Sequence, residues 1–297
     1  MHDRTAGSST RFILTGFAES SSRGRQLRCC PDADGNAPLR LAPRDRGAPW
    51  ALRLREALAR RQFVLHYQPI VWLDGSGVSH HEALLRLADG DRGQLIAPGE
   101  FLPYAERSGL IKEIDEMVLS EAVGLLGGLL ADRLAPVAVN LSALSVTDAH
   151  TLTHMKQLLQ LHDVDPSRLI VELTETAAIS DMVQAQRFCS GVRDLGCAVA
   201  LDDFGAGFGS FRYLKRLQFD YLKIDGDFIR GLPSSAKDQL VVEALVRVAK
   251  GMGKRTIAEY VGDGRTLELL QALGVDCAQG FEVGPPLRQT EAFAGVA

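Results

Sequence analysis

The chain has 297 residues, of which 46% are hydrophobic and 24% are charged, and its formal net charge is −4. This composition is that of a soluble globular protein with a sizeable core, enough for one large domain and a tail. No apolar run approaches the roughly 20 residues of a membrane-spanning helix, and residues 12–14 are too short for a signal-peptide core. The five cysteines form neither an even secreted framework nor a CxxC zinc pair. We therefore expect a cytoplasmic protein with reduced thiols and no membrane association.

Residues 1–49 are rich in Ser, Gly, Asp, Pro and Arg and have no sustained apolar period. They are predicted to be a disordered tail or the remnant of an upstream region. Residues 1–62 contain twelve Arg, no Lys and six acidic side chains, so the rest of the chain is net negative. This distribution argues against a nucleic-acid partner for the main body. The basic tail lacks interleaved aromatics and amphipathic order, so a solvated tail is preferred to one that contacts lipid or RNA.

From residue 50 onward the chain alternates between helical and strand patterns. A short initial helix is predicted over residues 50–61. Strands are predicted at 62–72, 81–87, 136–141, 168–173, 197–202, 220–224, 254–259 and 275–279. Helices are predicted at 111–130, 145–161, 180–194, 236–251 and 264–273. Ser145 and Asp148 resemble a capping box, while Gly196 and Gly274 are predicted to end their helices.

The order of these elements predicts an α/β fold. Repeated βα units build a parallel sheet, and about eight of them in about 250 residues favour a closed, TIM-like (β/α)8 barrel. The second strand follows the first through a turn with Gly75 and Gly77, which predicts a hairpin. We therefore expect a barrel with one antiparallel strand, preceded by the disordered tail.

Polar side chains follow the predicted strands at the point where each strand ends. They are Asn140, Glu172, Asp202, Asp203, Lys223, Glu259 and Gln279. Because the C-terminal strand ends of a barrel converge on one rim, these side chains are expected to meet. A single acidic residue at a strand end is most often a helix cap or a solvated loop group, and paired aspartates before a glycine also suit a turn. Their joint occurrence on successive strands favours a functional site.

The residue types at this rim indicate a metal site. Crowded carboxylates are costly to bury without compensating cations. Oxygen ligands from Asp, Glu and Asn, without Cys or His, suit Mg²⁺ or Mn²⁺. Two such ions about 3.5–4 Å apart can activate a water and neutralise a phosphodiester during in-line displacement. Lys223 would add a positive charge beside that water.

At these residues the sequence resembles an EAL domain, over about residues 52–286. The naming tripeptide is Glu82-Ala83-Leu84. Seven further motifs follow the family's order and spacing: Tyr67-Gln68-Pro69-Ile70, Val139-Asn140-Leu141-Ser142, Glu172-Leu173-Thr174-Glu175, Asp202-Asp203-Phe204-Gly205, Lys223-Ile224-Asp225, Ala258-Glu259 and Gln279-Gly280. Eight motifs together make chance agreement implausible, and they assign residues 50–297 to one EAL phosphodiesterase domain.

The resemblance implies hydrolysis of cyclic di-GMP to linear pGpG with two Mg²⁺ or Mn²⁺ ions, in a protein that is commonly a homodimer. One metal would be held by Glu82, Asn140, Glu172 and Asp202, and the second by Asp202, Asp203 and Glu259. Lys223 would polarise the attacking water, and Glu259 and Asp203 would also take part in catalysis. Gln68, Leu84, Arg86 and Gln279 would contact the substrate. Glu175 would anchor the loop that begins at Phe204.

Three points stay open at this stage. Phe101, in an apolar segment over residues 98–103, is predicted either to stack a guanine base or to belong to the core. The family commonly has a second Glu three residues after the position of Glu259, where this chain has Gly262, with Asp263 as the candidate to replace it. Loss of a site residue is typical of non-catalytic cyclic di-GMP receptors, so a receptor acting through a protein partner is the alternative function.

Overall fold

The computed structural model describes residues 50–89, 94–128, 134–205 and 214–294. The predictions for the tail over residues 1–49, and for most of the loop after Phe204, lie outside the described residues. None of the helices in the described part of the chain is long and apolar enough to cross a membrane.

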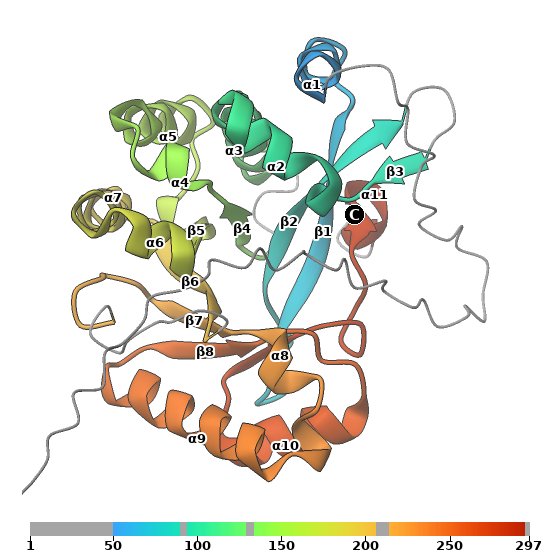
Figure 1. Cartoon of the computed structure of the whole chain (residues 1–297), viewed down its shortest axis with the longest axis vertical. Helices are drawn as coiled ribbons and strands as arrows, with labels where there is room; N and C mark the ends of the chain where they lie inside the picture. The colour runs from blue at the N-terminus through green and yellow to red at the C-terminus, as the bar shows by residue number, and fades with distance from the viewer. Residues whose placement is uncertain (1–49, 90–93, 129–133, 206–213, 295–297) are drawn as a thin grey trace, which may run out of the picture. The chain divides into compact units, whose positions relative to one another are not determined.

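Eight strands close into a barrel around which the helices are arranged (Figure 1). Its strands are β1 (Phe63–Trp72), β2 (Val78–Asp89), β4 (Val137–Asn140), β5 (Leu169–Thr174), β6 (Ala198–Phe204), β7 (Tyr221–Ile224), β8 (Arg255–Ala258) and β9 (Cys277–Gln279). The hydrogen-bonded order is β1-β9-β8-β7-β6-β5-β4-β2, and pairing between β1 and β2 closes the ring. Short strands β3 (Gln94–Ile96) and β10 (Leu287–Arg288) extend it.

Strand β1 is antiparallel to both of its barrel neighbours, β2 and β9, whereas the remaining pairs around the barrel are parallel. The turn between β1 and β2 contains Gly75 and Gly77, with φ of 84° and 102°. Glycine adopts this left-handed region without the steric cost that a Cβ atom imposes. The predicted barrel with one antiparallel strand is therefore confirmed.

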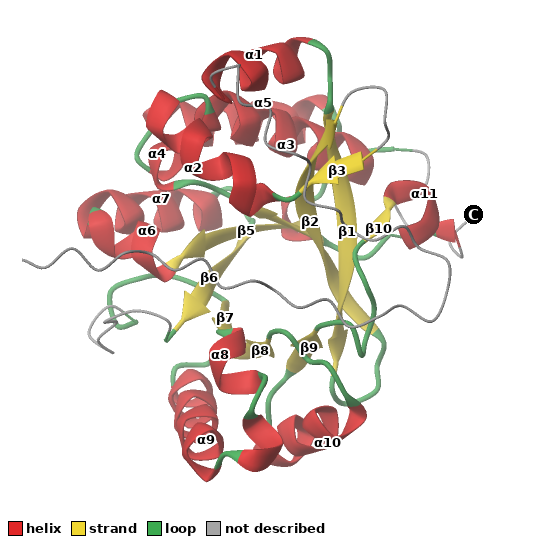
Figure 2. Cartoon of the chain, turned by 45° about the vertical axis from the view of Figure 1, so that its right-hand side comes forward, coloured by secondary structure: helices red, strands yellow, loops and turns green. Residues whose placement is uncertain are grey.

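Helices cover the outside of the strands, as Figure 2 shows. They are α1 (Trp50–Ala59), α2 (Pro98–Ser108), α3 (Ile111–Leu126), α4 (Ala143–Val146), α5 (Ala149–Leu161), α6 (Glu175–Ser180), α7 (Met182–Asp194), α8 (Gly226–Ile229), α9 (Ala236–Gly251), α10 (Gly264–Leu273) and α11 (Gln289–Ala292). Gly196 and Gly274 adopt φ of 95° and 78° just after α7 and α10, which confirms both predicted helix stops.

One predicted helix feature needs correction, and helix α2 was missed. Ser145 and Asp148 do not form a capping box, because Ser145 lies inside α4 and Asp148 is the N-cap of α5, where it accepts a hydrogen bond from His150 N. Helix α2 was not predicted, although Pro98 stands in its first turn, where proline is tolerated. Pro103 inside this helix masks its periodic pattern.

The inside of the barrel is closed by one layer of side chains, drawn mostly from apolar residues. This layer contains Ile70, Ala138, Ile170, Ala200, Tyr221, Ile257 and Cys277, one from each of seven strands. Because side chains alternate between the two faces of a strand, the residue two positions away on each strand also points into the barrel. This layer therefore forms the floor of the barrel, and the inward-pointing residues nearer the C-terminal rim lie on top of it.

Candidate active site

The residues directly above this floor are the polar ones that the sequence predicts as a site. Two positions beyond the floor residues stand Gln68, Asn140, Glu172, Asp202, Lys223, Glu259 and Gln279. Strand β2 adds Glu82, which is paired in register with Gln68 of β1. Strand alternation thus brings eight polar side chains, spread over more than two hundred positions of the chain, into one ring at the rim.

Lys223 lies at the centre of this ring, and its side chain is only 1% exposed. Its Nζ atom is 2.7 Å from Glu172, 2.8 Å from Glu259, 2.9 Å from Asp202 and 3.2 Å from Glu82. One ammonium group therefore faces four carboxylates from four different strands. Burying charge without a partner is costly. Among the described residues, Lys223 forms the ion pairs that compensate the negative charge of these four carboxylates.

Side-chain amides complete the ring around Glu82. Asn140 Nδ2 donates to Glu82 Oε1 at 2.6 Å, and Gln279 Nε2 donates to Glu82 Oε2 at 2.6 Å. Gln279 Nε2 also lies 3.2 Å from Gln68 Oε1, while Gln68 Nε2 donates to the carbonyl oxygen of Gly284 at 3.0 Å. Both oxygens of Glu82 are thus occupied, which fixes the orientation of its carboxylate.

Three carboxylates of the site, Glu172, Glu259 and Asp203, have a raised pKa. Burial raises the pKa of Glu172, and neighbouring Glu82 and Asp202 raise it further against the opposing effect of Lys223. Burial also raises the pKa of Glu259 to about 8. For Asp203, burial together with the Asp202 and Asp225 carboxylates raises the pKa to about 6. A single ammonium group therefore leaves this cluster short of positive charge.

The donor set fits divalent cations that prefer oxygen. Asp202, Asp203 and Glu259 offer one oxygen each within 4.8 Å of one another. Glu172 Oε1 is buried and has no hydrogen-bond partner among the described residues. Carboxylate and amide oxygens without thiolate or imidazole are the ligands of Mg²⁺ and Mn²⁺. The ring therefore has both the charge and the free oxygen that such an ion requires.

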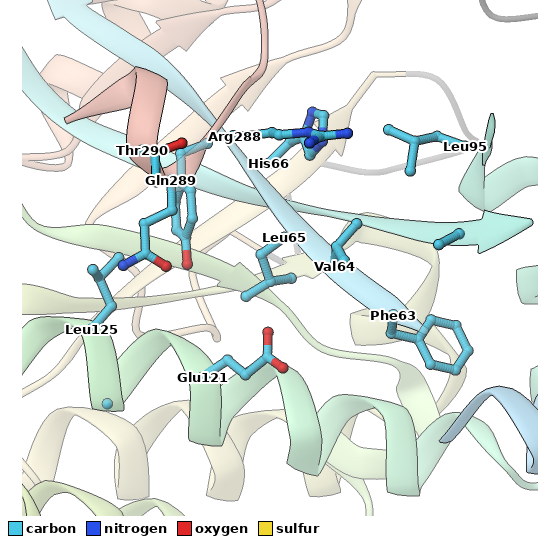
Figure 3. Close-up of a pocket in the computed structure, with 13 residues that line it drawn as sticks. Phe63, Val64, Leu65, His66, Leu95, Glu121, Leu125, Arg288, Gln289 and Thr290 are labelled. Carbon is cyan, nitrogen blue, oxygen red and sulfur yellow. The ribbon is translucent and has the colours of Figure 1, made fainter. Parts of the chain in front are cut away.

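A cavity of about 450 Å³ opens above the ring. Besides Gln68, Glu82, Asp202, Asp203, Lys223, Glu259 and Gln279, its lining includes Leu84, Arg86, Tyr260, Val261, Gly262, Gly280, Phe281 and Pro286. A larger cavity of about 780 Å³ lies on β1 between α3 and α11 (Figure 3), where Glu121 is the only acidic side chain in its lining. The smaller cavity is the candidate active site, because it contains the carboxylates and the buried lysine.

Gln68, Leu84, Arg86 and Gln279 all line this cavity, as expected of substrate contacts. Arg86 donates from Nη1 to the carbonyl oxygen of Leu85 at 2.8 Å. Glu175, predicted to anchor the loop after β6, accepts a hydrogen bond from Gly205 N at 3.1 Å through Oε2. The chain brings these residues to the same end of the barrel as the carboxylate ring.

The geometry decides two alternatives that the sequence left open. Phe101 is fully buried in the core and packs against Phe63, with ring centroids 5.7 Å apart, so it is unavailable to stack a base in this cavity. Asp263 does not replace the missing family Glu, because it is the N-cap of α10 and accepts from Thr266 N at 2.8 Å. Gly262 itself lines the cavity and leaves that position without a side chain.

The sequence did not single out Tyr260 and Phe281, which line the cavity and are among the exposed large apolar side chains. Tyr260 and Asp203 both have positive φ, 55° and 54°, although neither is glycine. Non-glycine residues in this region are uncommon and cluster at functional sites. The sequence signal for Tyr260 was its place directly after Glu259.

Comparisons with known proteins agree with this site. The model of the EAL domain family matches residues 51–286. The bifunctional diguanylate cyclase/cyclic di-GMP phosphodiesterase MucR of Pseudomonas aeruginosa is 39% identical over 82% of this chain and 36% of its own length. Cyclic di-GMP phosphodiesterase PdeB of Shewanella oneidensis is 36% identical over 81% of this chain and 28% of its own. The chain thus spans about a third of the length of these curated relatives.

Solved structures show the same arrangement. The structure of the PaMucR phosphodiesterase in complex with c-di-GMP has a TM-score of 0.75 and 38% identity, and it covers 82% of this chain and 99% of its own. The FimX EAL domain of Pseudomonas aeruginosa, bound to c-di-GMP, has a TM-score of 0.75 and 29% identity, over 81% of this chain and 97% of its own. The chain therefore belongs to the EAL domain family.

Proposed function

We propose that this chain hydrolyses cyclic di-GMP to linear pGpG in a reaction that depends on two Mg²⁺ or Mn²⁺ ions. The observation that carries the proposal is the four carboxylates that surround Lys223 beneath an open cavity. Relatives named as cyclic di-GMP phosphodiesterases support the same substrate.

The residues of the ring divide into two ligand sets that share Asp202. One ion would be held by Glu82, Asn140, Glu172 and Asp202, and the other by Asp202, Asp203 and Glu259. When bound, such ions activate a water and neutralise the negative charge of the phosphodiester. The buried, unpartnered oxygen of Glu172 and the close Asp202, Asp203 and Glu259 trio support this division.

Lys223 and Glu259 supply the acid–base and electrostatic roles. The oxygen of a water would form a bond to phosphorus while the bond from phosphorus to the ribose 3′ oxygen breaks. The phosphate would stay on the 5′ oxygen, and the 3′ oxygen would take up a proton from solvent and leave as a hydroxyl. Glu259, which lies beside Lys223 and lines the cavity, would accept a proton from the water. The Lys223 ammonium would polarise the attacking water, with Asp203 lining the same cavity.

The rest of the cavity would hold the dinucleotide. Gln68, Leu84 and Gln279 come from β1, β2 and β9 and surround the ring. Arg86, on the same face of β2 as Glu82 and Leu84, has a planar fork that suits two phosphate oxygens. Glu175 would hold the start of the loop after β6 through Gly205 N.

Hydrolysis of cyclic di-GMP by the purified chain with Mn²⁺, followed by chromatography, tests this proposal. The chain should produce pGpG, and the Glu82→Ala variant should produce none. Glu243→Ala is the matched control, because Glu243 pairs with Arg247 on the exposed face of α9 and should leave the activity unchanged. Absence of product from a folded wild-type chain would refute the proposal.

A non-catalytic receptor for cyclic di-GMP that acts through a protein partner is the second candidate. The observation that favours it is Gly262, which lines the cavity where the family commonly has Glu. Calorimetry in Ca²⁺ and then in Mg²⁺ separates the two functions. An enzyme binds in Ca²⁺ and turns the ligand over in Mg²⁺, whereas a receptor binds under both conditions without turnover.

We also propose that residues 50–297 act as one EAL unit in the cytoplasm and that this unit forms a homodimer. Light scattering coupled to size-exclusion chromatography checks the dimer. A monomer at micromolar concentration, with and without cyclic di-GMP, would contradict it.

A further inference from the structure

Tyr260 lies at the mouth of the candidate active site, immediately after Glu259 in the chain. Its side chain is 58% exposed and lines the cavity that contains the carboxylate ring. Its backbone is in the left-handed region, with φ of 55°. An aromatic residue in this region carries a steric cost that glycine avoids. The chain nevertheless has a large ring here.

One face of the Tyr260 ring rests on helix α8 and the residue that follows it. The Arg230 guanidinium lies over the ring, 4.1 Å from its centroid. A Cβ atom at Gly226 would collide with the same ring, so the ring lies directly against the backbone there. Residues four apart on a helix point to the same side. Gly226 and Arg230 therefore both contact the Tyr260 side chain.

Much of the Tyr260 side chain stays accessible from the cavity. A ring that served only to pack against α8 would be largely buried, whereas Tyr260 keeps more than half of its surface exposed. The Arg230 cation over the ring and the close approach at Gly226 hold the ring in a defined orientation, while more than half of the residue stays exposed. This arrangement is a rigid aromatic platform beside the carboxylates.

We propose that Tyr260 is a specificity-determining residue that stacks one purine base of the substrate on its exposed face. The inference rests on the proposed function, because the phosphodiester at the ring of carboxylates brings an attached guanosine to the cavity mouth. Stacking on an aromatic side chain selects planar heterocycles and is worth enough to change affinity measurably. Tyr260 would thus act on substrate binding, and the ring of carboxylates on the chemical step.

The test compares binding and stability in the same variants. Dissociation constants for cyclic di-GMP are measured by calorimetry in Ca²⁺, and melting temperatures are measured without ligand. Tyr260→Gly should weaken binding about 5- to 150-fold, as expected for the loss of one base–aromatic stack. The same variant should melt at an equal or higher temperature, because glycine relieves the positive φ. Tyr260→Phe should keep wild-type affinity, and Tyr260→Leu should not.

Tyr104→Ala provides the matched control. Tyr104 is 40% exposed and has Arg107 over its ring at 4.6 Å, but it does not line the cavity, so its loss should leave affinity unchanged. Steady-state kinetics in Mn²⁺ should show a raised KM for Tyr260→Gly, with kcat changed far less. If the wild type hydrolyses cyclic di-GMP and Tyr260→Gly binds it equally well, the inference is wrong. If the wild type neither binds nor hydrolyses it, the proposed function fails as well.

Discussion

Replacing Lys223 with methionine should destabilise the metal-free protein severely. The substitution keeps the length and apolar stem of the side chain but removes an ammonium group that faces four carboxylates within 3.2 Å. Removing one partner of a buried ion pair typically costs about 3–5 kcal/mol, because the other charge stays buried without compensation. Lys223 is 1% exposed, so solvent cannot screen the change. We expect a loss of about 3–5 kcal/mol in the free energy of unfolding.

Urea denaturation in EDTA near neutral pH measures this loss. Lys112→Met is the control, because Lys112 also forms a short ion pair, 2.6 Å from Asp148, but its side chain is 43% exposed. An exposed pair of this kind contributes about 0–1 kcal/mol. Mn²⁺ should restore part of the stability of Lys223→Met, since a divalent ion replaces the missing positive charge. Equal losses for both variants in EDTA would refute the view that Lys223 compensates the ring.

The remaining predictions concern proton uptake, the core and the loop contact. The pKa values of Asp203 and Glu259 are raised to about 6 and about 8 in the folded state. Their contribution to stability is complete below the unfolded values near 4 and is lost as pH rises through about 6 and about 8. Urea midpoints in EDTA should therefore fall from about pH 5 to about pH 8.5, and a rise would contradict the assignment. Phe101→Ala should lower the free energy of unfolding, measured in urea, by about 3–5 kcal/mol. The KM for cyclic di-GMP should stay unchanged, and a raised KM would show that Phe101 contacts the substrate. Glu175→Gln should lower Mn²⁺ affinity or kcat/KM about 10- to 100-fold, measured by calorimetry and kinetics, and wild-type values would show that the Gly205 contact is dispensable.

The polar residues at the strand ends were predictable from the sequence. Side chains alternate between the two faces of a strand, and the C-terminal ends of barrel strands converge on one rim. On each of the six parallel strands of the floor, the site residue follows the floor residue by two positions, as Glu172 follows Ile170 and Lys223 follows Tyr221, whereas on antiparallel β1 Gln68 precedes Ile70 by two. The type of each element followed from short β-branched runs and helical periods. These patterns were enough to predict the barrel, its antiparallel strand and the convergence of the polar residues.

Other features depend on tertiary contacts that no local pattern encodes. Phe101 lies between Pro98 and Pro103, in a stretch that suits a surface loop, yet α2 forms there and the ring packs against Phe63 in the core. Asp263 follows the missing family Glu, but its carboxylate is needed at the start of α10. The exposed platform of Tyr260 depends on Arg230, which is thirty residues earlier in the chain.

Anomalous diffraction from crystals grown with Mn²⁺ and cyclic di-GMP tests the central claim most directly. The account predicts two manganese peaks about 3.5–4 Å apart at the C-terminal rim of the barrel. One peak would touch Glu82, Asn140 and Glu172, the other Asp203 and Glu259, with Asp202 between them. Either of two results would contradict this claim. In the first, the cyclic di-GMP phosphate contacts Mn²⁺ at another place. In the second, the ligand fills the cavity while Lys223 is still paired to all four carboxylates and no manganese is bound.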